Sequence, residues 1–337
     1  MANIVILGCG AFGTALSVMC QHSGHQVTVW SRSPVKLDEK DGRRYHKKLP
    51  ETAVPEDISF TTDLSCVAGC DLLILAVPSF AVRESCQRIR DRIDRKTLVV
   101  CVAKGLEKDS FKDFVTIVEE ELPDNDCVAL SGPSFATEIA KGIPTTVVVA
   151  SRKREAANQV QDMLMNHSFR IYVSDDVIGV ELGGALKNII AVCSGICDGL
   201  LDHAANAKAA LITRGITEIA RLGVAMGGRQ ETFAGLSGIG DLILTCSSSQ
   251  SRNYRFGQLL SQGVPVQQAL DSIGMVVEGY YCTDIAYQLA QKMKVDMPIL
   301  TQAYQVLYQG KEPRQAVMDL MSRPKRHESE KIWLEMQ

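Results

Sequence analysis

The pattern of apolar and polar positions divides the chain into two parts. Between Asn3 and Val173, short apolar runs alternate with segments whose apolar residues recur every three or four positions. The runs are typical of buried strands, and the second spacing is typical of amphipathic helices. Strands that alternate with helices predict a parallel sheet with helices on both faces. After Val173 only the helical spacing continues.

The predicted fold class is therefore α/β: a doubly wound, Rossmann-type, mostly parallel sheet followed by an all-α domain. We place the first domain at residues 1–178 and the second at 179–337. A chain of 337 residues is long enough for two domains of ordinary size. The expected strands are 3–7, 26–30, 58–61, 72–77, 97–103, 127–130, 146–150 and 169–173. The clearest helices are 81–93, 111–121, 154–165 and 181–200.

Three glycines follow the first strand. Gly8, Gly10 and Gly13 form a G-x-G-x-x-G motif that opens a helix and precedes the strand 26–30. In this setting Gly8 permits a tight turn, Gly10 lets a pyrophosphate approach, and Gly13 lets helix and strand pack closely. The N–H groups and the dipole of the helix then face the phosphates. The motif predicts a dinucleotide cofactor.

The residues after the second strand indicate which dinucleotide is bound. A site selective for NAD usually has a carboxylate there, which bonds the ribose 2′-hydroxyl. This chain has Ser31, Arg32 and Ser33, with no carboxylate before Asp38. Because a guanidinium can pair with a 2′-phosphate, Arg32 favours NADP, with NAD as the alternative.

A basic run, 43–48, follows this region. Such a run is usually a solvated loop. Its other interpretation is a flap beside the nucleotide, with Tyr45 as the contact.

Lys187 is the only lysine or arginine in the helix predicted at 181–200. This helix is apolar nearly all round, which predicts burial in a domain core. A lysine is almost never fully buried without a partner. Gly183 and Gly184, one turn earlier, leave room for a ligand against the ammonium. Lys187 is therefore either a reacting amine or a lysine that extends to solvent.

Lys104 and the loop 131–136 lie at the carboxyl ends of predicted strands. Ligands of doubly wound sheets bind beyond these ends. A lysine there can reach an anion. The alternatives are a surface lysine and a plain turn into the next helix, with Ser134 as its N-cap.

The second half contains two further candidates. Asp241 follows a glycine-rich approach, and is either a helix N-cap or a carboxylate that meets a ligand or orients the lysine. Ser251, Arg252 and Asn253 stand at a predicted helix start. The helix N-terminus and the guanidinium together make a good phosphate receptor, and the alternative is a serine-rich capped turn.

Composition excludes several classes of protein. A net charge of −3 gives no general attraction to nucleic acid or to an anionic membrane. No run approaches the roughly 20 apolar residues of a membrane span, and the N-terminus lacks the pattern of a signal peptide. Eleven cysteines without a C-x-x-C pair indicate reduced thiols in a cytoplasm. The six histidines lack the spacing of metal ligands, so we expect no metal.

In this order, the motifs resemble those of bacterial NAD(P)-dependent glycerol-3-phosphate dehydrogenases over nearly the whole chain. The matching segments are 8–16, 30–32, 77–79, 104–105, 131–136, 186–188, 238–241, 244–246, 251–253 and 276–279. One departure is Phe12, where the family often has tryptophan.

The resemblance implies reversible hydride transfer between C2 of sn-glycerol 3-phosphate and the nicotinamide, with dihydroxyacetone phosphate as the ketone. The product feeds phospholipid synthesis, and Lys187 is the proton acceptor. The implied substrate contacts are Lys104, Gly132, Ser134, Asp241, Ser251, Arg252 and Asn253. The implied cofactor contacts are Phe12, Arg32, Tyr45, Lys104, Ala136, Arg252, Val276 and Glu278. A cytoplasmic homodimer is also implied.

The chemistry of Lys187 agrees with this role. Burial and a nearby Lys104 would lower its pKa toward neutrality, while a substrate phosphate and Asp241 would raise it. His203, past the end of the helix, is the only rival for proton transfer. Two other functions remain as alternatives. One is a β-hydroxyacid or ketopantoate-type dehydrogenase, and the other is a nucleotide-binding redox sensor without catalysis.

Overall fold

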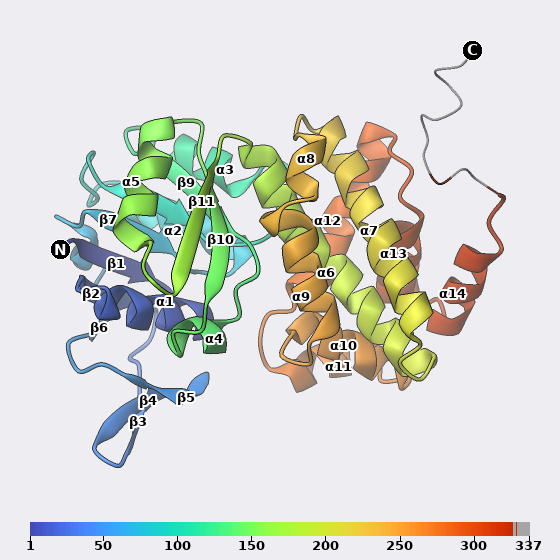
Figure 1. Cartoon of the computed structure of the whole chain (residues 1–337), viewed down its shortest axis with the longest axis horizontal. Coiled ribbons are helices and arrows are strands. Elements are labelled where there is room, and N and C mark those ends of the chain that lie inside the picture. The colour runs from blue at the N-terminus through green and yellow to red at the C-terminus, as the bar shows by residue number, and fades with distance from the viewer. Residues whose placement is uncertain (326–327, 329–337) are drawn as a thin grey trace.

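The computed structural model describes residues 1–325 and residue 328, and it has a sheet-based half and a helical half (Figure 1). The main sheet has the strand order β11-β10-β9-β8-β7-β1-β2-β6. Every neighbouring pair is parallel except β9 and β10. The strands are β1 (Asn3–Leu7), β2 (Gln26–Trp30), β6 (Ser59–Thr61), β7 (Leu72–Leu75), β8 (Leu98–Cys101), β9 (Cys127–Ser131), β10 (Thr145–Ala150) and β11 (Phe169–Ser174). The predicted Rossmann-type sheet is confirmed.

The central strands are apolar along their whole length because both faces of the sheet are covered. All four residues of β7 and all four of β8 are buried. A parallel sheet needs such runs, since helices pack on either side. The helices of this half are α1 (Ala11–His22), α2 (Val82–Ile89), α3 (Phe114–Glu121), α4 (Ala136–Ala140) and α5 (Arg154–Leu164).

A second, three-stranded sheet extends from the body of this half (Figure 1). It consists of β3 (Leu37–Lys40), β4 (Arg43–His46) and β5 (Leu49–Val54). The expectation of a solvated loop at the start of the basic run was therefore wrong. Charged residues on a strand with little buried surface give no alternation of apolar and polar positions, so the usual strand signal is absent. Leu49 and Val54 are buried, which attaches the small sheet to the body.

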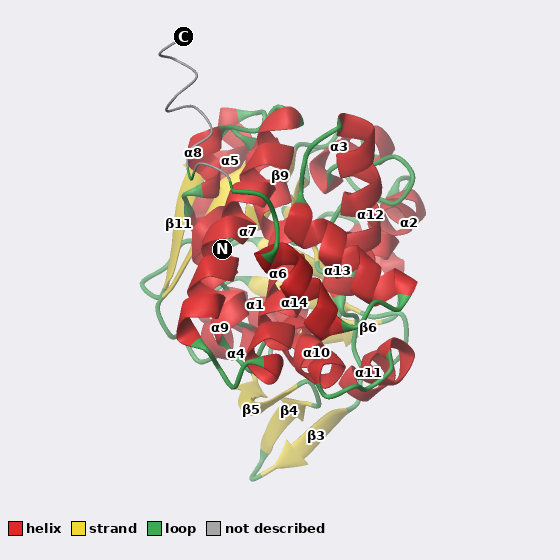
Figure 2. Cartoon of the chain, turned by 90° about the vertical axis from the view of Figure 1, so that its right-hand side faces the viewer, coloured by secondary structure: helices red, strands yellow, loops and turns green. Residues whose placement is uncertain are grey.

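The helical half is organised around α6 (Val177–Leu200) (Figure 2). This helix contacts α7, α9, α10 and α12. Its length and hydropathy would suffice for a membrane span, but 89% of the apolar window is buried inside the protein. It is therefore a core helix, as the sequence predicted. The other helices are α7 (Ala205–Ala225), α8 (Gln230–Phe233), α9 (Asp241–Ser247), α10 (Arg252–Ser261), α11 (Val266–Ile273), α12 (Glu278–Met293), α13 (Pro298–Gln309) and α14 (Pro313–Met321).

The junction between the halves is short. β11 ends at Ser174, and α6 begins at Val177 after an N-cap at Asp176, whose carboxylate accepts the N–H of Gly179 at 2.9 Å. The division at 178/179 stays a prediction. None of the eleven cysteines, all within the described residues, is in a disulfide.

Candidate active site

Lys187 is buried at the centre of the molecule, with 6% of its surface exposed. Its ammonium donates to the Asp241 carboxylate and, at 2.6 Å, to the hydroxyl of Thr245. A buried charge is stable only when it is paired and hydrogen-bonded, and Asp241, 1% exposed, meets this need. The alternative that Lys187 extends to solvent is wrong.

Lys104 approaches the same carboxylate from the other half of the molecule. Its Nζ donates to Oδ2 of Asp241 at 2.7 Å and to the carbonyl of Gly132 at 3.1 Å. Because β8 and β9 are parallel neighbours, Lys104 and Gly132, which follow them, meet at one edge of the sheet. Lys104 is thus no simple surface lysine. One carboxylate joins two ammonium groups across the two halves.

These contacts set the proton affinity of the buried amine. Burial lowers the pKa of Lys187 from its ordinary value to about 8, Asp241 acts against that shift, and Lys104 acts with it. An amine with a pKa close to neutrality can both release and accept a proton at physiological pH. The site can therefore serve as acid or base toward an oxygen beside Lys187.

Asp241 is the first residue of α9, and Gly240 is the N-cap. The interpretation of Asp241 as an N-cap is therefore wrong, and its carboxylate is used by the two lysines.

The Ser251–Asn253 segment begins α10 and lies beside α6. Ser251 caps this helix by accepting the N–H of Tyr254 at 3.2 Å. Asn253 donates to the side chain of Asn188 at 2.8 Å. Since Asn188 follows Lys187 directly, the segment is one residue along α6 from the buried amine. A phosphate at this helix start would be close to the buried amine.

The glycine-rich turn has room where a dinucleotide needs it. Gly8 has φ +119°, and a Cβ there would lie 2.4 Å from the carbonyl oxygen of Ala76, so only glycine fits. A Cβ at Gly10 would meet nothing within 4 Å. Gly10 is the N-cap of α1, whose free N–H groups border this open space. The turn therefore fits the phosphates of a dinucleotide.

Residues predicted to contact the cofactor also gather at the start of α12. Glu278, its first residue, accepts the N–H of Ser79 at 3.2 Å and the hydroxyl of Ser79 at 2.6 Å. Burial raises the pKa of Glu278. Arg252 donates to the carbonyl of Val276 at 2.9 Å. These contacts bring α10, the approach to α12 and the turn after β7 together.

Other predicted residues are on the surrounding elements. Arg32 is exposed beyond β2, and Tyr45 is half-buried on β4. The next residue, His46, lies with Nε2 3.5 Å from Sγ of Cys9, which brings the small sheet against the glycine-rich turn. Phe12 is half-buried in α1.

In the loop between β9 and α4, Ser134 does not cap the helix that follows. Ser134 donates to the carbonyl of Gly132 at 2.9 Å, and Phe135 is the N-cap of α4. The N-cap interpretation of Ser134 is therefore wrong. Ala136 is the first residue of α4.

Comparison with known proteins assigns the family. A model described as the NAD-dependent glycerol-3-phosphate dehydrogenase N-terminus matches residues 3–157, and the corresponding C-terminus model matches 176–318. The chain belongs to the NAD-dependent glycerol-3-phosphate dehydrogenase family.

Individual members of this family match nearly the whole chain. A glycerol-3-phosphate dehydrogenase [NAD(P)+] of Desulfitobacterium hafniense is 50% identical over 99% of this chain and 95% of its own. The crystal structure of glycerol-3-phosphate dehydrogenase from Coxiella burnetii is 41% identical, with a TM-score of 0.90, over 96% of this chain and 99% of its own. A ketopantoate reductase of Ralstonia eutropha covers 94% of this chain and 99% of its own, at 15% identity and a TM-score of 0.58, which shows a shared fold alone.

Two residues within the segments that resemble the family, Ser79 and Thr245, were not predicted as site residues. Thr245, which contacts the ammonium of Lys187, is four positions after Asp241 on α9. That spacing places both on one helix face and could have identified it. Ser79, the partner of Glu278, follows β7, and the rule that ligands bind beyond carboxyl ends applies to it as well.

Proposed function

We propose that this chain is an NAD(P)-dependent sn-glycerol-3-phosphate dehydrogenase that reversibly reduces dihydroxyacetone phosphate, with Lys187 as the general acid and base. The observation that carries the proposal is the buried Lys187, paired with Asp241 and joined through it to Lys104. The family assignment and the 50% identical relative named glycerol-3-phosphate dehydrogenase [NAD(P)+] support it.

Reduction of the ketone needs a proton at the C2 oxygen, and oxidation of the alcohol needs that proton removed. A nicotinamide dinucleotide held at the turn of Gly8, Gly10 and Gly13 would supply the hydride chemistry at C2. Lys187 gives its proton to the C2 oxygen in reduction and recovers it in oxidation, because its pKa of about 8 permits both states. Asp241 keeps the amine oriented toward the substrate through the ion pair. Thr245 holds the same nitrogen from a second side.

The remaining predicted residues divide between the phosphate ester and the cofactor. We assign the substrate to Lys104, Gly132, Ser134, Lys187, Asp241, Ser251, Arg252 and Asn253. The N-terminus of α10 and the Arg252 guanidinium suit the phosphate group, because their charges add to one another. We assign the cofactor to Gly8, Gly10, Phe12, Gly13, Arg32, Tyr45, Lys104, Ala136, Arg252, Val276 and Glu278.

The direct test follows NADPH absorbance after dihydroxyacetone phosphate is added. The purified chain should oxidise NADPH with this ketone and should be far slower with unphosphorylated keto acids. Lys187→Ala should lower turnover by about 10²- to 10⁴-fold while NADPH still binds, since general acid–base catalysis is worth that much. Near-normal turnover by the variant would remove Lys187 from the mechanism. Faster reduction of ketopantoate would favour the other dehydrogenase class.

We propose that Arg32 lets the enzyme accept NADP as well as NAD. A charged hydrogen bond is worth about 1.5–3 kcal/mol, so Arg32→Ala should weaken NADPH about 10- to 100-fold and NADH much less. Dissociation constants for both cofactors measure this. A strong preference for NADH that is unchanged in the variant would refute it.

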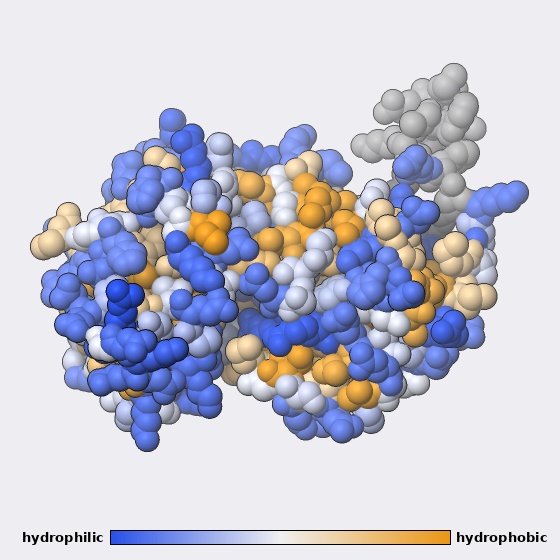
Figure 3. Space-filling view, turned by 60° about the horizontal axis from the view of Figure 1, so that its bottom comes forward, coloured by the Kyte–Doolittle hydropathy of each residue, from blue (hydrophilic) through white to orange (hydrophobic). Residues whose placement is uncertain are grey.

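We further propose that the enzyme is a cytoplasmic homodimer that supplies phospholipid synthesis. The family resemblance supports all three parts of this proposal, and the apolar patches on the helical half in Figure 3 support the dimer alone. Exposed apolar side chains in this half include Ile243, Tyr281, Met318 and Met321. Sedimentation equilibrium should give twice the mass of the 36.8 kDa chain, and a monomer at micromolar concentration would contradict the dimer.

A further inference from the structure

The side chain of Ser131 is a buried polar group at the site with no role so far. Ser131 is the last residue of β9 and is 3% exposed. Its hydroxyl has no hydrogen-bond partner among the described residues. A hydroxyl can donate one hydrogen bond and accept two, and burying it without a partner forfeits the bonds it makes to water in the unfolded chain. The packing of the sheet gives no reason for this cost, so a ligand is its natural explanation.

The hydroxyl of Ser131 faces α6 one turn before Lys187. A Cβ built on Gly184 would lie 2.5 Å from Oγ of Ser131 and 3.7 Å from Cγ and Cδ of Lys104. Gly184 therefore has no room for a side chain, and both the Ser131 hydroxyl and the side chain of Lys104 lie against α6 at this residue. Residues three apart on a helix share a face, so Ser131 and the amine of Lys187 border the same side of α6.

The contacts along α6 place these groups in order. Ser131 contacts the helix at Gly184, the amine leaves it at Lys187, and Asn253 bonds to Asn188. Four residues of helix span about 6 Å, which is comparable to a three-carbon phosphate ester. If the C2 oxygen meets Lys187 and the phosphate lies toward Asn253, the unphosphorylated end points toward Ser131.

We propose that the hydroxyl of Ser131 binds the C1 hydroxyl of dihydroxyacetone phosphate and of glycerol 3-phosphate. This inference rests on the proposed function. Because Ser131 is 3% exposed, substrate reaches its hydroxyl only if a neighbouring side chain shifts, and the flexible neighbour at this position is Lys104. Ser131 then discriminates in favour of ketones that carry a free hydroxyl at C1, because only these give the buried group a partner.

The test compares dihydroxyacetone phosphate with hydroxyacetone phosphate, which has a methyl group in place of the C1 hydroxymethyl. In the wild type, kcat/KM should be higher for dihydroxyacetone phosphate. Ser131→Ala should lower kcat/KM for dihydroxyacetone phosphate about three- to tenfold, the loss expected for one hydrogen bond between neutral groups. The same variant should leave hydroxyacetone phosphate nearly unchanged. Equal losses on both substrates would overturn the proposal.

Thermal unfolding separates this role from a structural one. Ser151 is a matched control: a serine of the same half, buried at 4% exposure, that donates to the carbonyl of Cys127 at 2.8 Å. Ser151→Ala should lower the unfolding temperature and affect both substrates alike. Ser131→Ala should not lower it, since it removes an unpaired hydroxyl. A large loss of stability in Ser131→Ala would make Ser131 a structural residue.

Two further outcomes are distinct. Ser131→Cys keeps most of the volume but offers a weak donor, so it should repeat the selective loss. If neither variant folds, Ser131 is structural and the proposal fails. If the wild type does not reduce dihydroxyacetone phosphate at all, the proposed function fails, and the contrast between the two ketones has no meaning. If the wild type reduces dihydroxyacetone phosphate but the Ser131 variants lose kcat/KM equally on both ketones, only the role of Ser131 is refuted.

Discussion

Opposing effects act on the amine of Lys187. Burial favours the neutral form and is the largest effect on its pKa, while Asp241 favours the charged form. Removing a partner from a buried pair leaves the other charge uncompensated. The Asp241 carboxylate therefore limits how far burial lowers the pKa of Lys187 below its ordinary value. The balance has a measurable consequence in the pH dependence of the reaction.

Oxidation of glycerol 3-phosphate needs the neutral amine. The kcat/KM for this oxidation reflects protonation of the free enzyme. In the wild type it should therefore rise with pH, reach half its maximum near pH 8 and level off above that. Asp241→Asn removes the charge that supports the ammonium. Its plateau should begin at lower pH, and maximal activity should fall because the amine is less well oriented. The substrate phosphate titrates near pH 6, and this adds a separate pH dependence that is the same in the wild type and in Asp241→Asn.

The matched control is Asp271→Asn, at an exposed carboxylate on α11. It should leave the pH profile of the wild type unchanged. If the rise in kcat/KM of Asp241→Asn is still centred near pH 8, the ion pair does not set the pKa of Lys187.

At the level of elements, a buried carboxylate links α7 to α13. Glu218 accepts the N–H of Ile299 at 2.9 and 3.1 Å and that of Leu300 at 3.2 Å. These are free donors of the first turn of α13.

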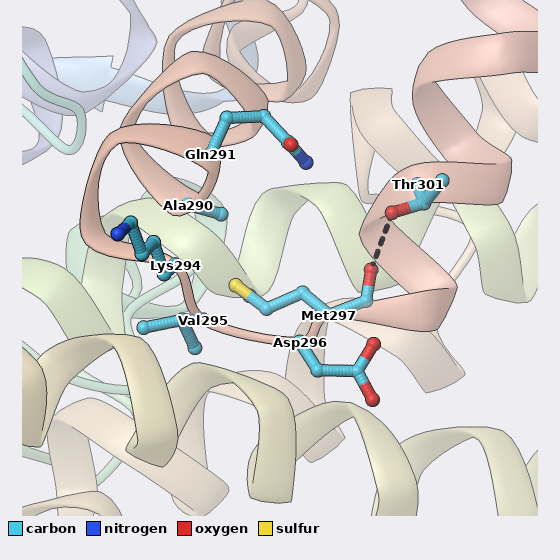
Figure 4. Close-up of a pocket in the computed structure, with 7 residues that line it drawn as sticks. All are labelled: Ala290, Gln291, Lys294, Val295, Asp296, Met297 and Thr301. Carbon is cyan, nitrogen blue, oxygen red and sulfur yellow. Dashed lines mark hydrogen bonds between the residues drawn. The ribbon is translucent and has the colours of Figure 1, made fainter.

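A pocket of about 250 Å³ lies beside this turn, lined by Ala290, Gln291, Lys294, Val295, Asp296, Met297 and Thr301 (Figure 4). None of the predicted site residues lines it.

Burial raises the pKa of Glu218 to about 7. In the unfolded chain it is near 4.3, so between these values the folded state binds more protons. Stability should therefore fall as pH rises from about 5 to 8, by on the order of 1–3 kcal/mol from this group. Glu218→Gln keeps an acceptor oxygen but cannot ionise. Its unfolding temperature should change less over this range than that of the wild type, and parallel curves would contradict the assignment.

Elements with a strong local pattern could be predicted, and the small sheet could not. The strands β7 and β8 and the helix α6 are apolar enough for sequence alone to define them. The strands β3 and β4 consist largely of charged residues, and their pairing depends on the turn at Asp41 and Gly42, both at positive φ. Nothing in the apolar pattern reports such a strand.

At the level of the whole molecule, the sequence offered Asp241 as a carboxylate that orients Lys187, but it did not show that the same carboxylate also binds Lys104. Lys104 and Asp241 are 137 positions apart, and Lys187 and Asp241 are 54 apart. Each residue could be recognised from its local setting, whereas their convergence depends on how the helical half lies on the sheet. Ser131 illustrates the same limit, because its missing partner appears only once α6 is seen beside β9.

A second contact across the halves, between Ser79 and Glu278, should join the two halves energetically. Both hydrogen bonds end on a carboxylate, and a bond to a charged group is worth about 1.5–3 kcal/mol. Ser79→Ala removes the hydroxyl, and Glu278→Gln weakens the acceptor for both donors. In a double-mutant cycle, the two losses in unfolding free energy should sum to more than the double variant loses, by about 1 kcal/mol or more.

The control pair is Ser272→Ala with Glu278→Gln, because Ser272 bonds within α11 to the carbonyl of Gln268. The losses in unfolding free energy from these two control substitutions should add. If the losses of Ser79→Ala and Glu278→Gln also add, the contact does not couple the halves, and the pair of lysines on Asp241 becomes the better candidate for that coupling.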